Sequence, residues 1–514
     1  MMHPTPSPGR QAHSRTLIAQ RALLPLLLGL GLSGCTLTPP ARAPQMVDSQ
    51  MQNYGSKLAD QQTAASPTGI GNSGISQHLA YGQQLPDEWW QLFRSPALDK
   101  LVREALQNNP SLGAARAALK QAEENYNAAA GSLQYPSVSG QLGGSRQHQL
   151  LSGSTPSTYN VLSAGLNVSY SLDLFGANRQ QLLGLMAATD YQRYQLEATY
   201  QTLIFNVVTT AIQEASQRAQ LQATQEMLAA SEQQLRIVEK QAALGGVARS
   251  NVLSQATLVA QTRAQLSPLE KALDLTRHQL AVYVGKFPSE QGLPEFTLDS
   301  LQLPAELPVS LPSELVRQRP DIRASEALLQ QAGAAVGVAT ANQYPQINLT
   351  GSFTRERLFV GPATTGLSLW SIGAGVTQSL FDGGSLRAKK RAADAAFEQA
   401  QAQYRDTVLK GFQNVADSLR AVSADASTLQ AQTEAEARAR ETLQLTEKRF
   451  RLGAVSQLAL LDAQRTWQQA RISLISASAS RHADSAALFL ALGGGWWNRN
   501  GNDGNAEQSA QARP

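Results

Sequence analysis

The sequence predicts an α+β membrane protein that is internally duplicated, with four strands and two pairs of long helices in each chain. Three observations carry this prediction. Two segments, beginning at Leu162 and Trp370, alternate strictly between apolar and small polar residues, as strands with one apolar and one polar face do. Each segment leads into a very long helical pattern. The whole arrangement starts again after an offset of about 208 residues, which indicates an internal repeat.

The composition narrows the class of protein. The 514 residues carry a net charge of +4 and only 16% are charged, so the chain lacks the footprint of a nucleic-acid-binding protein. Aromatic residues make up 6%, while alanine, glutamine and leucine dominate, which suits long packed helices better than one large globular core. The single cysteine rules out an internal disulfide, so packing or association with other chains has to stabilise the fold.

The amino terminus has the pattern of an exported lipoprotein. Arginines precede a short apolar run, residues 22–32, that is too short to span a bilayer. The run ends in Leu32-Ser33-Gly34-Cys35, which resembles the bacterial lipobox, where the cysteine thiol receives diacylglycerol. We therefore predict a signal peptide over residues 1–34 and a covalent diacylglycerol and palmitate on Cys35. An ordinary signal peptide with an incidental cysteine is the alternative. Thr36, where some lipoproteins have aspartate, favours export to the outer membrane.

The first repeat is predicted over residues 86–285. Before it, residues 35–85 are rich in Pro, Gln, Ser and Gly and are predicted to form an irregular, lipid-anchored tether. The repeat opens with a short amphipathic helix that Asn109-Pro110 ends, followed by heptad-spaced residues typical of coiled-coil-like packing. Tyr135-Pro136 then turns the chain into a pair of strands joined by a polar loop over roughly residues 145–160.

A single long helix follows the strands. No proline occurs between Gln180 and Leu244, so about sixty residues should form one helix, on the order of 95 Å long. A helix of that length needs lateral partners. Gly245-Gly246 should end it, and a return helix is expected over residues 250–284, where Pro268 should kink or interrupt it. Residues 286–312 are proline-rich and are predicted to be a linker.

The second repeat is predicted over residues 313–493. Arg319-Pro320 corresponds to Asn109-Pro110, and Tyr344-Pro345 corresponds to Tyr135-Pro136. Because the offset hardly changes along the chain, the pattern indicates one duplication rather than a helical solenoid. Residues 494–514 are rich in Gly, Asn and Gln and are predicted to be a disordered tail.

The strand count has a physical consequence. Four strands cannot close a membrane barrel, for which about eight is the minimum. The apolar strand faces fit lipid and the Ser/Gly/Thr faces fit water, but an open sheet edge in lipid costs several kcal/mol for each unpaired backbone group. Three chains would supply twelve strands and close the barrel together. A soluble sandwich of two hairpins on helical stalks is the alternative, but it leaves the lipobox, the duplication and the stalk length unconnected.

An ordered set of short motifs extends this prediction across both repeats. They are Leu32 to Cys35, Trp89-Trp90 with Phe93, Asn109-Pro110, Tyr135-Pro136, Leu172-Asp173-Leu174-Phe175-Gly176, Leu380-Phe381-Asp382-Gly383-Gly384 and Leu460-Leu461-Asp462-Ala463-Gln464-Arg465. The set resembles the outer-membrane factor family, the TolC-like channels, and within it the OprM/NodT-type efflux lipoproteins. The resemblance implies a homotrimer in which a twelve-strand outer-membrane β-barrel is continuous with a long periplasmic α-helical barrel. It also implies an exit duct for small amphiphilic compounds in a tripartite pump. The implied partners are a periplasmic adaptor (membrane fusion) protein and an inner-membrane transporter, commonly of the RND class.

Catalytic chemistry is not predicted. The six histidines are scattered, none lies in an H-E-x-x-H pattern, and no G-x-S-x-G segment occurs. With its one cysteine predicted to be lipidated, the chain has no thiol nucleophile. We therefore expect no enzyme activity, no metal site and no cofactor beyond the lipid on Cys35.

The functional residues are expected at the periplasmic end of the helices. In the outer-membrane factor family, acidic and apolar side chains near the second-repeat hairpin hold that end closed. Carried over onto the motif around Asp462, this implies a gate made by Asp462, Leu458 and Val455. Three such carboxylates around one axis would set a cation preference and form a gate that partners can open. The alternatives are a solvated or paired carboxylate for Asp462 and plain helix packing for Leu458.

Two further groups of residues are candidates for contacts. The tips of the helical hairpins are expected to meet the adaptor, through Gly245, Gly246, Arg451 and Gly453, although a solvated face is an alternative for Arg451. Tyr170 and Trp370 are expected at the membrane interfaces, with ordinary packing as the competing explanation.

Two other functions stay open at this level. A type I protein-secretion channel would keep the duct but change the cargo, and the lipobox favours small-molecule efflux over it. A non-conducting structural lipoprotein scaffold would use the helices without a channel, but the alternation of the strands argues against it.

Overall fold

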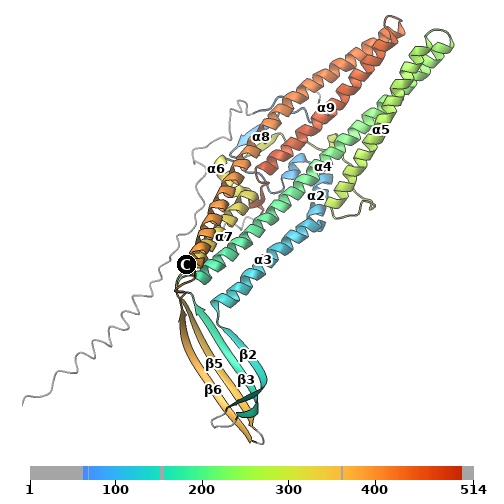
Figure 1. Cartoon of the computed structure of the whole chain (residues 1–514). Coiled ribbons are helices and arrows are strands. Elements are labelled where there is room, and N and C mark those ends of the chain that lie inside the picture. The colour runs from blue at the N-terminus through green and yellow to red at the C-terminus, as the bar shows by residue number, and fades with distance from the viewer. Residues whose placement is uncertain (1–61, 67–68, 151–155, 361–362, 500–514) are drawn as a thin grey trace, which may run out of the picture. The chain divides into compact units, whose positions relative to one another are not determined.

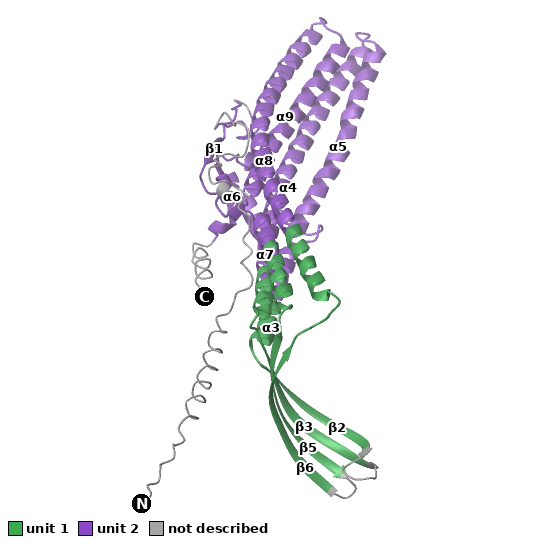
Figure 2. Ribbon diagram, turned by 60° about the vertical axis from the view of Figure 1, so that its left-hand side comes forward, with its two compact units in different colours: residues 1–42, 124–187, 329–399 green, residues 43–123, 188–328, 400–514 purple. Residues whose placement is uncertain are grey.

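The computed structural model describes residues 62–66, 69–150, 156–360 and 363–499 (Figure 1). The predicted signal peptide, the lipidated Cys35 and most of the tether lie outside these residues, as do residues 500–514 of the predicted tail. The chain divides into two compact units (Figure 2). The sheet unit comprises residues 124–187 and 329–399, and the helical unit comprises residues 43–123, 188–328 and 400–514, each within the described part of the chain.

The sheet unit contains both predicted hairpins. The strands are β2 (Ser137–Leu150), β3 (Pro156–Leu172), β5 (Gln346–Val360) and β6 (Ala363–Thr377), antiparallel in the order β2-β3-β5-β6. The loop that the sequence predicts over residues 145–160 is shorter, because the strands continue to Leu150 and resume at Pro156. Polar side chains in this region still pair across the ladder: the Tyr159 hydroxyl donates to Oε1 of Gln147 over 3.0 Å. The loop was predicted too long because its residues are polar, but backbone pairing continues where both strand faces are polar.

The register separates the side chains of the sheet into two faces. The apolar face carries Val138, Leu142, Leu166, Val168, Leu349, Phe353, Trp370, Ile372 and Val376. The polar face carries mainly Ser, Thr, Asn and Gly, and hydroxyl groups pair across it, as in Ser137–Ser169 at 2.7 Å and Ser352–Ser371 at 2.8 Å. From Leu162 to Val168 the side chains on the apolar face of β3 are exposed, whereas those on the polar face from Val161 to Asn167 are half-buried. Figure 2 shows that the sheet is curved. Because side chains on a concave face crowd one another, the burial difference indicates that the polar face is the concave one.

The long helices confirm the duplication. Helices α4 (Ala177–Ala243) and α8 (Ser385–Arg451) have 67 residues each, and α5 (Arg249–Tyr283) and α9 (Gln457–Ala491) have 35 each. The second of each pair starts 208 residues after the first (385 minus 177, and 457 minus 249). At 1.5 Å per residue, the longer two span roughly 100 Å. The shorter helices are α2 (Pro96–Asn108), α3 (Pro110–Gln134), α6 (Pro312–Gln318) and α7 (Pro320–Ala341).

Pro268 does not interrupt the return helix. It lies inside α5, which continues unbroken to Tyr283. A proline in a helix removes one backbone hydrogen bond, but a helix supported by neighbours can tolerate that loss. None of the helices in the described part of the chain combines the length and the apolar character that crossing a membrane requires.

The core of the helical unit draws on segments that the sequence places outside both repeats. Strand β1 (His78–Tyr81) pairs in parallel with β4 (Glu306–Val309). The predicted tether and linker thus form a small sheet, and Leu79, Leu85, Phe296 and Leu307 are buried in the same core as Trp89, Phe93 and Phe489. The structure differs here from the sequence prediction because isolated apolar residues in a Pro- and Gln-rich segment have no periodicity, although each one can still fill a core.

Arginine side chains attach the first and the last described segments of the chain to the helical unit. Arg481, on α9, is 1% exposed and donates to the Ser73 carbonyl, to Oγ1 of Thr63 and to Oε1 of Gln77. We call residues 62–66 and 69–85 the amino-terminal arm, because these hydrogen bonds attach them to α9. Beyond α9 the predicted disordered tail is ordered as far as residue 499, and η3 (Trp496–Asn498) leads to Arg499.

Arg499 fixes this last described segment. Its guanidinium pairs with Asp87 at 3.1 Å and with Glu197 at 2.9 Å, and it lies 3.9 Å from the centre of the Tyr200 ring. Glycine-rich sequence suggested disorder, but Gly494 and Gly495 adopt positive φ angles of 73° and 74° against neighbouring side chains and backbone. Glycine is needed there because a side chain would not fit.

Candidate functional site

The tips of the two helical hairpins have the same local structure. Gly245 and Gly453 have φ angles of 74° and 72°. At the first tip, Gly246 N–H donates to the Gln241 carbonyl over 2.8 Å, and at the second, Ala454 N–H donates to the Arg449 carbonyl over 2.9 Å. This pattern is the Schellman motif, in which a left-handed residue satisfies the last carbonyls of a helix. A Cβ at either glycine would meet nothing within 4 Å, so the tips are open to a partner.

The predicted gate residues lie at the start of α9, just after the second tip. Ser456 caps the helix, its hydroxyl accepting from Ala459 N–H over 3.3 Å. Leu458 is 73% exposed, and Asp462 is one turn further on the same side of the helix. Val455 is half-buried before the cap. The structure therefore places Leu458 and Asp462 together and both accessible, with Val455 next to them.

Asp462 is not paired with any residue that the structure describes. It is exposed, and among the described residues it has no ion-pair or hydrogen-bond partner. The neighbouring Arg465 instead donates to Oε1 of Gln261 on α5 over 3.2 Å. Leu458 does not pack within one copy, because the buried positions in the first two turns of α9 are Gln457, Leu460, Leu461 and Ala463. Both side chains are therefore available to neighbouring copies, solvent or cargo.

The contact between the two return helices was not predicted. Amide groups bridge α5 and α9 at Gln255–Gln457, 2.9 Å apart, and at Gln265–Gln468, 2.8 Å apart. With the Gln261–Arg465 hydrogen bond, these make a polar seam, beside which lies a groove of about 670 Å³. Glutamines recur in both return helices of the sequence, but the sequence does not show which faces meet.

Inside each helical hairpin, a buried carboxylate joins the two helices, whereas the polar seam between the hairpins consists mainly of amide side chains. Between α4 and α5, Glu214 is completely buried and binds Arg218 at 2.8 Å and Arg277 at 2.6 Å. Between α8 and α9, the buried Glu436 binds Arg440 at 2.6 Å and accepts from Nε1 of Trp467 over 3.0 Å. Breaking a buried pair costs several kcal/mol, whereas a neutral hydrogen bond that water can replace contributes about 1 kcal/mol. Away from the shared core, where α5 meets α9, the two hairpins are thus joined by a seam that is weaker than the contacts inside each hairpin.

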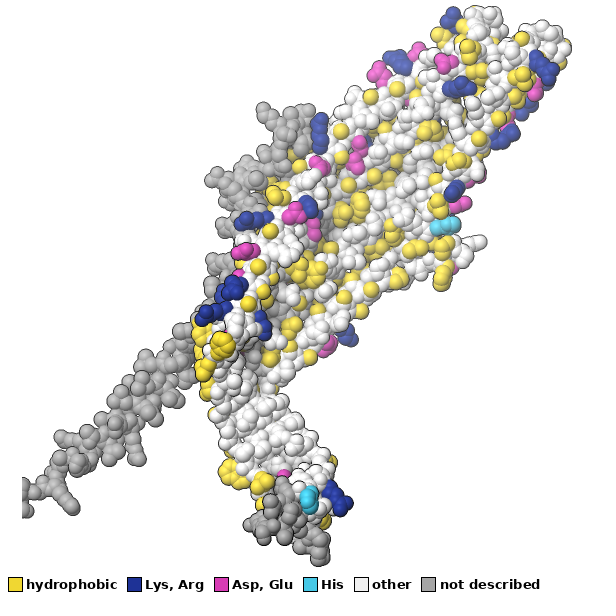
Figure 3. Space-filling model, in the orientation of Figure 1, with side chains coloured by type: hydrophobic (Ala, Val, Ile, Leu, Met, Phe, Trp, Pro, Cys, Tyr) yellow, Lys and Arg dark blue, Asp and Glu magenta, His cyan; other side chains and the backbone are white. Residues whose placement is uncertain are grey.

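The apolar face of the sheet is a large exposed surface. Trp370 is 74% exposed and Ile372 is 84% exposed. Soluble proteins rarely expose contiguous apolar patches of this kind, so the face points to lipid or to another chain. In the view of Figure 3 the sheet shows its polar side, nearly free of hydrophobic and charged side chains along the middle of the strands.

The two predicted interface aromatics occupy different levels of this sheet. Trp370 pairs with Phe353, seven residues into β5, whereas Tyr170 pairs with Leu349, three residues into it. Tyr170 is therefore inside the apolar stretch rather than at its edge. The helix-side edge carries other aromatics: Tyr135, Phe175, Tyr344 and Phe381, with the rings of Phe175 and Tyr344 stacked at 4.9 Å. The paired Tyr-Pro and Leu-Phe motifs of the repeats were the sequence signal for them.

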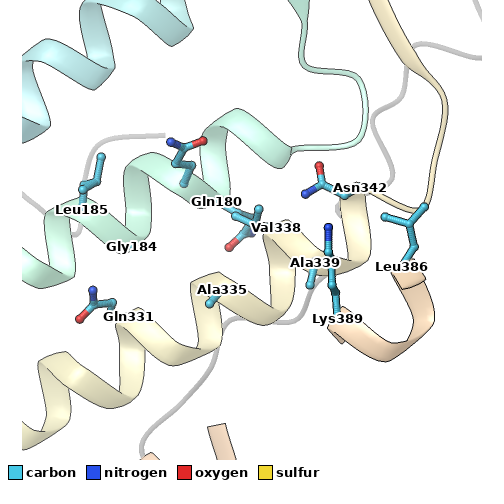
Figure 4. A pocket seen from close by; sticks show the side chains of 11 residues that line it. Gln180, Gly184, Leu185, Gln331, Ala335, Val338, Ala339, Asn342, Leu386 and Lys389 are labelled. Atoms are coloured by element: carbon cyan, nitrogen blue, oxygen red, sulfur yellow. The ribbon is translucent and has the colours of Figure 1, made fainter. Parts of the chain in front are cut away.

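A cavity of about 540 Å³ lies within the sheet unit, between α4, α7 and the start of α8 (Figure 4). Amide side chains from Gln180, Gln331 and Asn342 line it, together with Lys389. The helices approach closely because Gly337 has no side chain, and a Cβ there would lie 2.7 Å from the Gln180 side chain. The lining holds no carboxylate, hydroxyl, thiol or imidazole side chain. Within the described residues, no group of His, Cys, Asp and Glu is arranged to hold a metal ion.

Comparison with known proteins shows which family the chain belongs to. The model of the outer membrane efflux protein family matches residues 101–286 and 311–494, once over each repeat. The chain belongs to the outer membrane efflux protein family. It is 32% identical over 497 residues to the pyoverdine export outer membrane protein OpmQ of Pseudomonas putida, covering 94% of this chain and 98% of OpmQ.

Other members of the family agree with this assignment. The chain is 30% identical over 491 residues to the cation efflux system protein CusC of Escherichia coli, covering 92% of this chain and 99% of CusC. Its structure superposes on that of the outer-membrane channel OprN with a TM-score of 0.79 and 26% identity, covering 90% of this chain and all of OprN. These relatives confirm the predicted TolC-like family, the outer-membrane efflux function and the location in the outer membrane. They are channels and efflux proteins rather than enzymes.

Proposed function

We propose that three copies of this chain close a twelve-stranded outer-membrane β-barrel and form the exit duct of a tripartite efflux pump. The observation that carries the proposal is the pair of open edges on the sheet. In the described chain β2 pairs with β3 alone and β6 with β5 alone, which leaves one unpaired edge on each outer strand. Such edges cannot stay open in lipid.

The edges fit one another. Strands β2 and β6 have 14 and 15 residues, and they run in opposite directions because the sheet of four is antiparallel throughout. Strand β6 of one copy can therefore pair in antiparallel fashion with β2 of the next, and the same contact repeated around a ring closes the wall. Twelve strands with a polar interior would surround an aqueous bore, with the concave polar face inside.

The height of the apolar face supports the same arrangement. From Tyr344, at the helix-side aromatic edge, to Phe353, which pairs with Trp370, the chain advances nine residues (353 minus 344). That is about 30 Å along an extended strand, or about 23 Å of height when the strand tilts by roughly 40°. The apolar band of outer-membrane barrels is about 25 Å tall.

The partners and the anchor complete the proposal. Cys35 carries diacylglycerol and palmitate and tethers each copy to the membrane. Gly245, Gly246, Arg451 and Gly453 at the hairpin tips contact a periplasmic adaptor, which links the duct to an inner-membrane RND-type transporter. The chain catalyses no reaction and binds no nucleic acid. The relatives are named for the export of pyoverdine and the efflux of toluene and cations, and we propose small amphiphilic compounds as the cargo here.

The gate is proposed at the start of α9. Three copies of the exposed and unpaired Asp462, with Leu458 and Val455, narrow the bore, and the polar seam between α5 and α9 separates when the gate opens. Wild-type channel reconstituted in planar bilayers should conduct weakly, and the Asp462→Ala/Leu458→Ala variant should conduct at least tenfold better. Asp406→Ala/Leu409→Ala is the matched control, since it removes an exposed aspartate and an exposed leucine from α8.

Three measurements separate this proposal from its competitors. Absence of conductance in both the wild type and the gate variant would favour a structural scaffold. Deletion of the gene should lower tolerance to amphiphilic toxicants and leave secreted proteins unchanged, and the reverse pattern would favour type I secretion. The mass of the detergent-extracted complex should correspond to three chains, each with a covalent lipid.

A further inference from the structure

Three arginines stand together on the apolar face of the sheet, at the end away from the helices. Arg146 lies on β2, and Arg355 and Arg357 lie on β5. On β5, the register places Arg355 beside Ala164 and Arg357 beside Leu162 of β3. On the other side of β3, Arg146 of β2 is paired with Asn160, two residues before Leu162 on the same face. All three guanidinium groups therefore project from the face that carries Trp370 and Ile372. Figure 3 shows dark blue side chains at this end of the sheet.

These cations have no counter-charge within the sheet. The only carboxylate in the four strands is Glu356, which lies between two of the arginines and so points to the polar face. All three arginines are exposed, and within the described residues none forms an ion pair. Arg355 and Arg357 are on the same side of one strand, about 7 Å apart, where like charges repel. The sheet gains nothing from this placement by itself, which points to an anionic partner outside the chain.

Two grooves that contain apolar side chains lie beside the arginines. One, of about 510 Å³, is lined by Leu142, Leu166 and Phe353 and ends at Arg355. The next, of about 470 Å³, is lined by Leu162 and Phe359 and includes Arg146.

Glycines make these depressions. Gly140 and Gly144 face this side of β2 without side chains, and a Cβ at Gly144 would meet nothing within 4 Å. An apolar channel that ends at a guanidinium matches an acyl chain joined to an anionic headgroup.

The level of the arginines fits a headgroup. Arg355 lies two residues beyond Phe353, so the cations come immediately after the apolar stretch that ends near Trp370. Aromatic side chains mark the boundary of the hydrocarbon region, and cations just outside it meet phosphate groups. Arginine is suited to this contact because its planar guanidinium binds phosphate oxygens in a bidentate manner.

We propose that Arg146, Arg355 and Arg357, with the two grooves beside them, bind a phosphorylated lipid of the outer leaflet. The inference rests on the proposed function, because it requires the apolar face to lie in the outer membrane. The occupant is a lipid in the bilayer and not free phosphate, because both grooves bring apolar side chains next to the cations. Each bound lipid places an acyl chain in the groove lined by Leu142, Leu166 and Phe353, and its phosphate on the guanidinium groups.

The test uses full-length channel in phosphatidylcholine nanodiscs that contain either lipid A, which carries phosphates, or its dephosphorylated form. Retention of each lipid is measured by mass spectrometry. The Arg355→Gln/Arg357→Gln variant should retain lipid A about 25-fold less well than the wild type. Each cation contributes a factor of about five to binding at an anionic surface, and the two factors multiply. Arg355→Lys/Arg357→Lys, which keeps the charge but loses the bidentate geometry, should fall between them.

Controls make the result specific. Arg438→Gln/Arg449→Gln removes the same charge from exposed positions on α8 and should retain lipid A as the wild type does. Inorganic phosphate should not displace the lipid. If the double glutamine variant does not fold, Arg146→Gln alone should show a loss of about fivefold.

The inference is overturned if the variants retain lipid A equally, if the dephosphorylated form is retained as well as lipid A, or if inorganic phosphate displaces the lipid. Planar-bilayer conductance separates these failures from failure of the proposed function. A wild-type chain that neither inserts nor conducts would reject the barrel itself, and with it the lipid site.

Discussion

Replacement of Arg481 by methionine tests how the amino-terminal arm is held. Arg481 is buried and supplies three hydrogen bonds to the arm, to Ser73, Thr63 and Gln77. Each hydrogen bond from a charged group is worth about 1.5–3 kcal/mol, but burial of the guanidinium costs several kcal/mol in return. Loss of one partner from a buried charged network typically costs 3–5 kcal/mol. We expect about 3 kcal/mol, which increases local opening of the arm about 150-fold.

Hydrogen exchange of backbone amides in the arm measures that opening. The informative amides are Thr63, which donates to the Gln77 carbonyl over 2.9 Å, and His78, which donates to the Ala305 carbonyl over 2.8 Å. Both should lose protection in Arg481→Met, while amides in the middle of α8 keep theirs. Arg438→Met is the control, because among the described residues that exposed arginine forms an ion pair only with the exposed Glu441. Unchanged protection at Thr63 and His78 in Arg481→Met would refute the assignment of the arm to this arginine.

Three further outcomes follow from local geometry. Gly495→Ala should lower the unfolding midpoint in detergent by the equivalent of about 3 kcal/mol, because a Cβ there would clash with the backbone of Leu85 and Pro86. Gly453→Ala has a similar positive φ but open space and should cost only about 1 kcal/mol, and equal effects would contradict the steric argument. Burial and the neighbouring Asp484 raise the pKa of Asp425 to about 7 from 3.8, so the folded chain holds a proton that the unfolded chain releases. Stability should therefore fall by about 1 kcal/mol as pH rises from about 4 to 7, and Asp425→Asn should remove this slope in urea titrations; a persisting slope would assign it elsewhere. Arg499→Ala should expose the segment after α9 to protease without changing conductance, and unchanged cleavage would show that the ion pairs do not hold it.

The gate shows how far motif and spacing can go. The motif around Asp462 led to a gate prediction at the first turns of α9, where Leu458 and Asp462 share an exposed side of the helix, and their role in a gate stays a prediction. The seam that joins the hairpins was not predictable in the same way. Gln255 and Gln457 come from different repeats, and only the packing of α5 on α9 decides that they meet.

Errors of prediction concentrate in segments without periodicity. Leu79 and Leu307 sit in Pro-, Gln- and Ser-rich stretches that were assigned to a tether and a linker, yet both are buried. Their position depends on a parallel pairing between β1 and β4 across more than two hundred residues. No local pattern encodes such a contact, because it is stabilised by a core that both repeats build.

The sequence by itself determined the elements of this protein and their repetition. Alternation of period two, long stretches without proline, and glycines at the ends of the helices set four strands and two pairs of helices, because these preferences act through backbone sterics and local hydrogen bonds. The tertiary structure alone decided which distant residues share a surface. It brought the unpaired arginines of β2 and β5 to one face, buried Arg481 against the arm, and paired glutamines across the seam, since such contacts depend on register and packing over the whole chain.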